Sequence, residues 1–255
     1  AEDQFVDNGN PQVLKPHSFS LIQFLSSDMK TKEYKRAVQD LYFLSSAINN
    51  WRSRCMPKCF DTGCTPLNEA AIAAIQMVPA FKAKHGVQIV NTIFLSDGDG
   101  HSMGANSWGS AKSYVHDPIT HKDYEIAENG HAAETAVYLQ ILRDRTGSNL
   151  IGIRLYAAKN IKNLRYRYFD FSDSGDSVMD NANKSWKQHN FFSVVAESYD
   201  RLFVVRGNLE AITDVLENID DDASYTKLKN AFIKSSSTAK GSRVIASQIV
   251  DIIAA

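Results

Sequence analysis

The sequence has no apolar run long enough to cross a membrane, few cysteines and almost no net charge. Its longest apolar stretches are strand-length, and Arg154 interrupts the one from Leu150 to Ala158, whereas a spanning helix needs about 20 apolar residues. The formal net charge of -1 gives no general attraction to nucleic acid or to an anionic membrane. The first residues also lack the shape of a signal peptide. We therefore expect a cytoplasmic protein that is not secreted.

Cysteine is scarce, and its three copies, Cys55, Cys59 and Cys64, lie close together. An odd number without a secretory signal favours a reducing compartment over a disulfide framework. The spacing matches no common zinc motif, although His85 could serve as a fourth ligand and keeps a zinc site open as an alternative. We expect thiols that are buried or partly buried around a loop.

Strand-like and helix-like patterns alternate along the rest of the chain. We predict strands at 19–24, 87–95, 150–157, 191–196 and 201–205, and helices at 32–50, 65–85, 130–146, 159–169, 224–235 and 241–254. Residues 174–188 fit either a helix or a polar loop, and the last two strands are expected to pair with each other. This order predicts an α/β fold with a doubly wound, mainly parallel sheet. We divide the chain into a lead-in at 1–17, a domain at 18–207 and a C-terminal helical extension at 208–255.

Local signals mark the ends of several elements. Thr65 is suited to cap a helix whose first position is Pro66, and His85-Gly86 is suited to end it. The strand at 87–95 runs into Ser-Asp-Gly-Asp-Gly at 96–100, a loop typical of a site in a parallel sheet. Residues 101–127 interrupt the alternation, and Asp117-Pro118 within them predicts the turn of a hairpin at 114–124. We interpret 101–127 as a surface insertion.

Two short segments resemble the von Willebrand factor A family. Residues 63–70, Gly-Cys-Thr-Pro-Leu-Asn-Glu-Ala, are similar to the family's Gly-Gly-Thr-Pro-Leu-x-x-Ala segment. Residues 93–100, Ile-Phe-Leu-Ser-Asp-Gly-Asp-Gly, resemble its strand that ends in Leu-Thr-Asp-Gly. Weaker similarity extends over roughly 18–205. The resemblance implies a von Willebrand factor A fold, similar to the Rossmann type, that binds a protein partner through a metal ion rather than catalysing a reaction.

The resemblance also implies the ligands of a metal-ion-dependent adhesion site. Thr65 would supply a hydroxyl to Mg²⁺ and Asp97 a carboxylate, directly or through water. The family's other segment, Asp-x-Ser-x-Ser after its first strand, has no equivalent here, because Ser26-Ser27-Asp28 differs in order and spacing and residues 173–177 lie too far downstream. Either that strand precedes Ala1 in a longer parent chain, which we favour, or the site is incomplete.

The same resemblance suggests partners for the edge of the domain. We expect Asp99, His101, His116 and His121, which lie in or beside the insertion, to contact a protein partner. The hairpin and the closing helix are similar to large-bacteriophage proteins of this class, which would put the protein in host cytoplasm or virion. Some related proteins of the cobaltochelatase CobT type pair with a MoxR-class AAA+ ATPase, so this ATPase or a phage structural protein is the expected partner.

Simpler interpretations accompany each of these residues. Thr65 can be only a helix cap, and Asp97 and Asp99 can be turn formers, which is the preferred interpretation for Asp99. His101, His116 and His121 with the two aspartates could form a zinc hydrolase site, but solvated loop histidines are favoured. The basic and aromatic residues at 159–168 could grip single-stranded nucleic acid, but a solvated helix face is favoured. A metal-free structural or assembly protein of a phage particle remains the alternative function.

Overall fold

The computed structural model describes residues 21–49, 60, 65–103, 113–126, 131–157, 159–169 and 173–207, together with 226, 227, 230, 245 and 247–250. The chain divides into two compact units. The described residues from 65 to 207 belong to one unit, and those before 61 and after 225 belong to the other.

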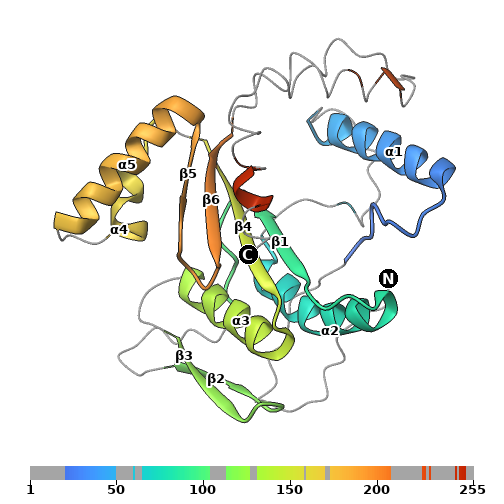
Figure 1. Ribbon diagram of the computed structural model, residues 1–255, viewed down its shortest axis with the longest axis horizontal. Helices are drawn as coiled ribbons and strands as arrows, with labels where there is room; N and C mark the ends of the chain where they lie inside the picture. Colours follow the sequence, from blue (N-terminus) through green and yellow to red (C-terminus); the bar gives the residue numbers. More distant parts are fainter. Residues whose placement is uncertain are drawn as a thin grey trace. The chain divides into compact units, whose positions relative to one another are not determined.

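The larger unit is built on a four-stranded sheet in the order β1-β4-β6-β5 (Figure 1). Strand β1 spans Asn91–Ser96, β4 Asn149–Tyr156, β6 Arg201–Arg206 and β5 Phe191–Val194. The first three strands run parallel, and β5 runs antiparallel to β6. The predicted α/β class with a mainly parallel sheet is confirmed, as is the pairing of the last two strands. The strand predicted to begin at Val87 begins at Asn91 instead.

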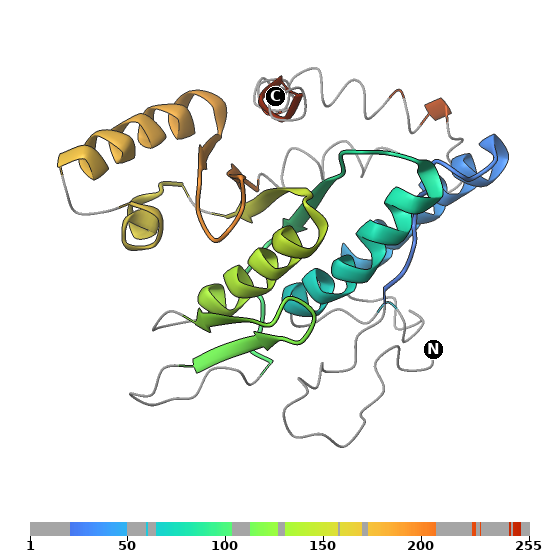
Figure 2. The same cartoon turned by 60° about the horizontal axis from the view of Figure 1, so that its bottom comes forward.

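Helices α2 (Leu67–His85) and α3 (His131–Thr146) pack side by side in this unit (Figures 1 and 2). Both end as predicted, because Gly86 (φ 63°) and Gly147 (φ 61°) adopt the left-handed conformation that favours glycine. Their backbone N–H groups bond back to Lys82 and Arg143, at 2.9 and 2.8 Å. Lys82 Nζ also donates to the Thr146 carbonyl at the end of α3, at 2.8 Å, so it links the carboxyl ends of the two helices.

One face of the sheet forms the main core. Its rows follow the strand register, and Phe94, Gly152, Leu202 and Val194 make one such row. Buried side chains from α2, α3 and α5 (Asp173–His189) join the same apolar cluster. The opposite face carries Ile93 and Leu95 of β1, which are 48% and 67% exposed. Of the apolar side chains of β1, Phe94 therefore packs on the core, whereas Ile93 and Leu95 remain exposed.

The predicted hairpin is confirmed as β2 (Ser113–Asp117) paired antiparallel with β3 (Lys122–Ile126). Its description as a surface insertion was wrong in part, because alternate residues on one face are buried. Val115, Tyr124 and Ile126 are 8% exposed or less and belong to the core cluster. The strand β3 contacts α3, so the hairpin adds a second layer behind that helix (Figure 2).

The helix predicted at 159–169 is broken into a 3₁₀ turn, η2 (Lys162–Leu164), and the four-residue helix α4 (Arg165–Tyr168). The reason is local, since Asn160 Oδ1 accepts a hydrogen bond from Lys162 N at 3.2 Å and forms a turn that delays the helix. Residues 174–188, for which two interpretations were open, are helical within α5. Trp186 of α5 packs against Tyr156 and Phe192, which fixes this helix to the sheet.

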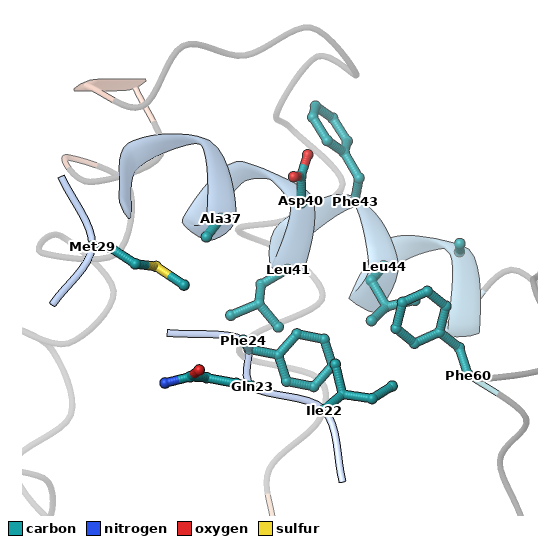
Figure 3. A pocket seen from close by; sticks show the side chains of 11 residues that line it. Ile22, Gln23, Phe24, Met29, Ala37, Asp40, Leu41, Phe43, Leu44 and Phe60 are labelled. Atoms are coloured by element: carbon teal, nitrogen blue, oxygen red, sulfur yellow. The ribbon is translucent and has the colours of Figure 1, made fainter. Parts of the chain in front are cut away.

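The smaller unit contains α1 (Thr31–Asn49), close to the predicted 32–50. The strand predicted at 19–24 was wrong where it can be examined, because residues 21–26 adopt no regular secondary structure. Their apolar side chains instead line a cavity of about 650 Å³ beside α1. Leu41 and Leu44 point toward Ile22 and Phe24 in this cavity (Figure 3). An isolated apolar segment gains more from such contact than from an unpaired strand.

Some predicted elements lie outside the described residues. The described positions 226, 227, 230, 245 and 247–250 are helical, but most of the predicted helices 224–235 and 241–254 lie beyond them. The three cysteines and the lead-in 1–17 also fall outside. Among the described helices, none is both long and apolar enough to cross a membrane.

Candidate functional site

The loop that follows β1 meets the segment that precedes α2. Thr65 O accepts hydrogen bonds from His101 N at 3.1 Å and from Leu67 N at 2.8 Å. A Cβ added at Gly98 would lie 3.6 Å from Thr65 Oγ1. The segment that holds Thr65 and the loop that begins with Asp97 are thus neighbours at the carboxyl end of β1, the end at which sites form in parallel sheets.

Thr65 does not cap α2 in the predicted way. Pro66 occupies the cap position, the helix begins at Leu67, and no side-chain capping hydrogen bond occurs there among the described residues. The backbone carbonyl of Thr65 is engaged instead, because the His101 ring also contacts it through Nδ1 at 3.0 Å. The backbone of Thr65 therefore holds the β1 loop.

Asp97 and Asp99 differ in their surroundings although they are two residues apart. Asp97 is exposed. The Asp99 carboxylate instead pairs with the forked guanidinium of Arg167, with Nη1 2.8 Å from Oδ2 and Nη2 bonded to Oδ1. Arg154 Nη2 lies 3.3 Å from Asp99 Oδ1. The preferred interpretation of Asp99 as a turn former was wrong, because its carboxylate takes part in an ionic network.

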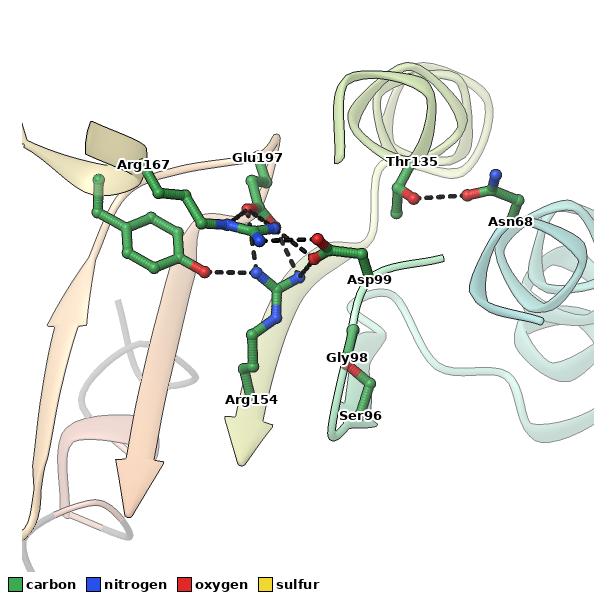
Figure 4. A network of polar contacts seen from close by, with 9 residues as sticks. Asn68, Ser96, Gly98, Asp99, Thr135, Arg154, Arg167 and Glu197 are labelled. Carbon is green, nitrogen blue, oxygen red and sulfur yellow. Dashed lines mark hydrogen bonds and ion pairs between the residues drawn. The ribbon is translucent and has the colours of Figure 1, made fainter. Parts of the chain in front are cut away.

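Glu197 completes this network between two arginines (Figure 4). Arg154 donates to it from Nη1 and Nη2 at 3.0 and 2.9 Å, a bidentate pair. Arg167 also donates to Glu197 Oε1, from Nε at 2.9 Å and Nη2 at 2.6 Å. Tyr168 accepts a further hydrogen bond from Arg154. Two cations and two anions therefore balance each other at this end of the sheet.

The network is most buried at its centre. The side chains of Arg154 and Glu197 are 8% and 10% exposed, while those of Arg167 and Asp99 are 28% and 33% exposed. Burial alone would lower the pKa of Arg167, but its hydrogen bond to Asp99 and the charge of Glu197 raise that pKa overall. The pKa of Arg154 is raised in the same way, with Glu197 opposing burial. Both arginines therefore stay charged.

A small cavity opens beside the network, with a volume of about 160 Å³. Asp97, Asp99, Arg154, Arg167 and Tyr168 line it together with apolar residues of β4 and β6. It is smaller than the roughly 300–1,000 Å³ of a typical drug-sized ligand site. The cavity therefore has room for one small group only.

His101 lies in a second, more buried polar cluster. Its ring Nε2 lies 2.9 Å from Glu69 Oε1, and Glu69 is fully buried in the first turn of α2. The other carboxylate oxygen of Glu69 is buried without a hydrogen bond from the described residues. The interpretation of His101 as a solvated loop histidine was wrong, since its side chain is only 24% exposed.

The β1 loop passes closely between the first turns of α2 and α3. Asn68 Oδ1 accepts a hydrogen bond from Thr135 Oγ1 at 2.6 Å, and both residues are buried. A Cβ at Gly100 would lie 2.6 Å from that hydroxyl, so glycine is required for the close approach. Met103 N then donates to buried Glu134 at 2.9 Å. Residues 100–103 are therefore fixed to both helices.

Tyr138 of α3 belongs to the same interior. Burial raises the pKa of its phenol, and the negative charges of Glu134 and Glu69 raise that pKa further. Its hydroxyl is buried without a hydrogen-bond partner in the part of the chain that is described. The hydroxyl therefore stays protonated at neutral pH.

The other predicted contact residues lie on the hairpin. His116 pairs with Asp123, with Nδ1 2.7 Å from Oδ1, and both side chains are exposed. His121 sits in the turn with a φ of 55°, and its ring centroid is 6.4 Å from that of His116. No group of three or more His, Cys, Asp or Glu residues that could hold a metal occurs among the described residues. The predicted aspartates and histidines thus do not form such a group.

The basic segment 159–168 also differs from the prediction. Arg167 faces the ionic network and not solvent alone, and its guanidinium lies 5.3 Å from the Tyr168 ring centroid. Tyr166 remains 81% exposed. The interpretation as a solvated helix face was wrong for Arg167, because Asp99 and Glu197 from distant segments pair with it, and for Tyr168, because its hydroxyl accepts a hydrogen bond from Arg154. These contacts occupy two of the side chains that the alternative grip on nucleic acid would use.

Sequence reasoning missed the residues that organise both clusters, Glu69, Arg154 and Glu197. Two of these residues could have been found from the sequence, because each is a charged residue within an apolar pattern. Glu69 precedes two alanines of a predicted helix, and Arg154 interrupts an apolar strand. Comparison with protein-family models, with curated proteins and with solved structures gives no match. The site's chemistry must therefore be argued from its own residues.

Proposed function

We propose that this chain is a protein-interaction module of the von Willebrand factor A type, with a doubly wound sheet, that binds an acidic side chain of a partner with the help of Mg²⁺. The supporting observation is the junction between Thr65 and the β1 loop, held by the hydrogen bond from His101 N to Thr65 O at 3.1 Å. Thr65 and Asp97 thereby belong to adjoining segments, as the two sequence motifs require.

The donor chemistry of this junction suits a magnesium ion. Mg²⁺ prefers oxygen ligands and keeps several waters, so that one or two protein oxygens can hold it. Thr65 offers a hydroxyl and Asp97 an exposed carboxylate. Asp99 is not part of this set, because Arg167 and Arg154 engage it. A bound ion would supply the positive charge that a partner's carboxylate recognises.

The helix beside the junction favours the same ligand. The 19-residue helix α2 begins at Leu67, directly after the Thr65-Pro66 segment. Among the described residues its first turn has no side-chain cap, and the amino end of a helix carries a partial positive charge. An anionic side chain of a partner is stabilised near such a helix end.

Paramagnetic Mn²⁺ tests the metal part of the proposal with the metal alone as the probe. Low Mn²⁺ concentrations are expected to broaden the backbone NMR signals of residues 65–68 and 97–101, and excess Mg²⁺ should reverse the effect. Thr65→Ala and Asp97→Ala should abolish the broadening, whereas Asp180→Ala, which removes an exposed aspartate on α5, should not. Equal broadening in Asp97→Ala and the unchanged chain would contradict the proposal.

The choice of a protein partner rests on the resemblance to the von Willebrand factor A family. A MoxR-class AAA+ ATPase is the first protein to test, with binding measured in Mg²⁺ and in EDTA. Binding that needs Mg²⁺ and is lost in Asp97→Ala is the expected result. Binding that is equal in both buffers would remove the metal from the mechanism.

A metal-free structural or assembly protein, such as one of a phage particle, is the second candidate. The observation that favours it is the ionic network, in which Arg154 and Arg167 already neutralise Asp99 and Glu197. Such a network stiffens the end of the sheet without any ion. The absence of a Mn²⁺ effect, together with Mg²⁺-independent self-association or assembly, would select this function.

A further inference from the structure

The cavity of about 160 Å³ beside the ionic network has the features of a small binding site. It lies at the level of Arg154, which is opposite Ser96, the last residue of β1. Its lining includes Arg154, Arg167 and Tyr168, and Leu155 and Val204 supply apolar surface. Few convergent polar groups on an apolar wall are typical of a ligand site.

Arg154 has a donor that the network leaves unused. Its side chain is 8% exposed, and its Nη1 and Nη2 are bonded to Glu197 and Tyr168. Its Nε is buried with no hydrogen-bond partner among the described residues. An unpaired buried donor costs free energy, and such groups in folded proteins usually indicate a missing water or ligand. The ligand expected at a guanidinium is an anion.

Asp99 is the member of the network that can most readily be exchanged. It is the most exposed of the four charged residues, at 33%, and it sits on a loop rather than on the sheet. Its two oxygens bond to Arg167 in a fork-to-fork arrangement. Arg154 also contacts it, at 3.3 Å, but bonds more closely to Glu197. The carboxylate of Asp99 therefore occupies the position at which the guanidinium of Arg167 holds an oxyanion.

We propose that Arg154 and Arg167 form a binding site for one small oxyanionic group, a carboxylate or a phosphate, and that Asp99 blocks this site until the ligand displaces it. Both groups match the planar fork of arginine. The volume excludes a nucleotide or a larger metabolite from lying wholly inside, so the ligand presents a single acidic group to the cavity. The site needs no metal and is separate from the Thr65 and Asp97 pair.

NMR titration with acetate and with inorganic phosphate, each in EDTA, tests this site. The Nε–H signals of Arg154 and Arg167 report directly on the two guanidinium groups. Asp99→Asn is expected to tighten binding of at least one probe about tenfold, the effect of freeing one charge-assisted hydrogen-bond pair. Asp180→Asn is the matched control, because it removes the same charge from an exposed position on α5.

Removal of the Arg167 guanidinium should weaken binding of the probes. Arg167→Gln, made together with Asp99→Asn, should lose the gain in affinity, whereas Lys162→Gln, which removes an exposed positive charge on η2, should retain it. If the Gln variant does not fold, Arg167→Lys keeps the charge without the fork and should weaken binding in the same direction.

The outcomes separate the possibilities. Tighter binding in Asp99→Asn supports the site, and the probe that binds more tightly identifies the group as carboxylate or phosphate. The proposal is overturned if Asp99→Asn and Asp180→Asn bind both probes equally, or if the arginine signals do not move. Because EDTA is present throughout, failure here leaves the Mn²⁺ result at Asp97 unaffected, and the reverse also holds.

Discussion

Arg145 on α3 holds Asp117 in the hairpin turn through both ends of its guanidinium. Nε donates to Asp117 Oδ2 at 2.9 Å, and Nη2 donates to Oδ1. The same carboxylate accepts hydrogen bonds from Ile119 N at 3.0 Å and from Thr120 Oγ1 at 2.6 Å. The Asp117 side chain is fully buried. One side chain therefore shapes the turn and also attaches the hairpin to the domain.

Asp117→Asn should lower the free energy of unfolding by about 2 kcal/mol at pH 7, the usual range for a hydrogen bond to a charged group. The hydrogen bond from Arg145 holds the pKa of Asp117 well below its usual range in the folded chain. A carboxylate with a lowered folded-state pKa stabilises the fold above its unfolded pKa of about 3.9, and this stabilisation is lost as the pH falls below that value. Urea unfolding at pH 7 and pH 3 should therefore show a difference that shrinks in acid.

Asp123→Asn is the control for this prediction. It removes an exposed acid, 67% exposed, from the same hairpin, where its neighbour is His116. Little change in stability is expected at either pH, as for most exposed ion pairs. A pH-independent difference for Asp117→Asn would show that the charge of Asp117 is not what stabilises the turn.

Gly100→Ala should destabilise the domain by about 2 kcal/mol through overpacking. Its Cβ would lie 2.6 Å from Thr135 Oγ1 and 2.8 Å from Asn68 Oδ1, two buried groups that cannot move without losing their own hydrogen bond. Gly98→Ala is the matched control, because the corresponding Cβ meets only Thr65 Oγ1, at 3.6 Å. Thermal unfolding of the two variants should therefore differ, and equal melting temperatures would count against the close approach.

His101→Ala should cost about 3 kcal/mol, because it removes the ring nitrogen that lies 2.9 Å from the fully buried carboxylate of Glu69 and leaves that carboxylate buried without this partner. Adding Glu69→Gln should restore part of the loss, since the uncharged amide tolerates burial better. A double-mutant cycle by urea unfolding measures this coupling. Strictly additive effects of the two changes would show that the pair does not interact.

Arg154→Lys should cost about 2 kcal/mol, although it conserves the charge. A lysine cannot reproduce the bidentate pair with Glu197 at 3.0 and 2.9 Å. Arg167→Lys, at a side chain that is 28% exposed, should cost about 1 kcal/mol or less. Urea unfolding compares the two variants, and an equal cost would refute the ranking by burial.

The elements predicted correctly are those with local signals. Gly86 and Gly147 end their helices because glycine alone adopts the left-handed conformation without strain. Asp117-Pro118 sets the hairpin turn, because the Asp117 carboxylate accepts a hydrogen bond from the backbone N–H of Ile119, two residues further on. The strand predicted at 19–24 was wrong where the structure describes it, because it lacks such a local signal. Its apolar pattern fits a strand, but a strand forms only beside a neighbouring strand, and the pattern does not show whether one is present.

The candidate site was predicted only at the level of its loops. The resemblance of the two motifs implied that Thr65 lies near the β1 loop, but it did not indicate the surroundings of Asp99. Asp99 and Arg167 are separated by 68 residues, and Arg154 and Glu197 by 43. Ion pairs over such separations depend on how the sheet and its connections fold together. A buried charge in an apolar segment signals that a partner exists without identifying it.

The tight passage of Gly100 between α2 and α3 also determines how the β1 loop can move. Gly100, His101 and Met103 are anchored by sterics and by hydrogen bonds to Thr65 and Glu134. Asp99, just before this passage, pairs with Arg154 and Arg167. A ligand that displaces Asp99 from these two arginines would therefore shift residues 97–99, while Gly100 keeps its place between the two helices. The bodies of the two helices would stay in place.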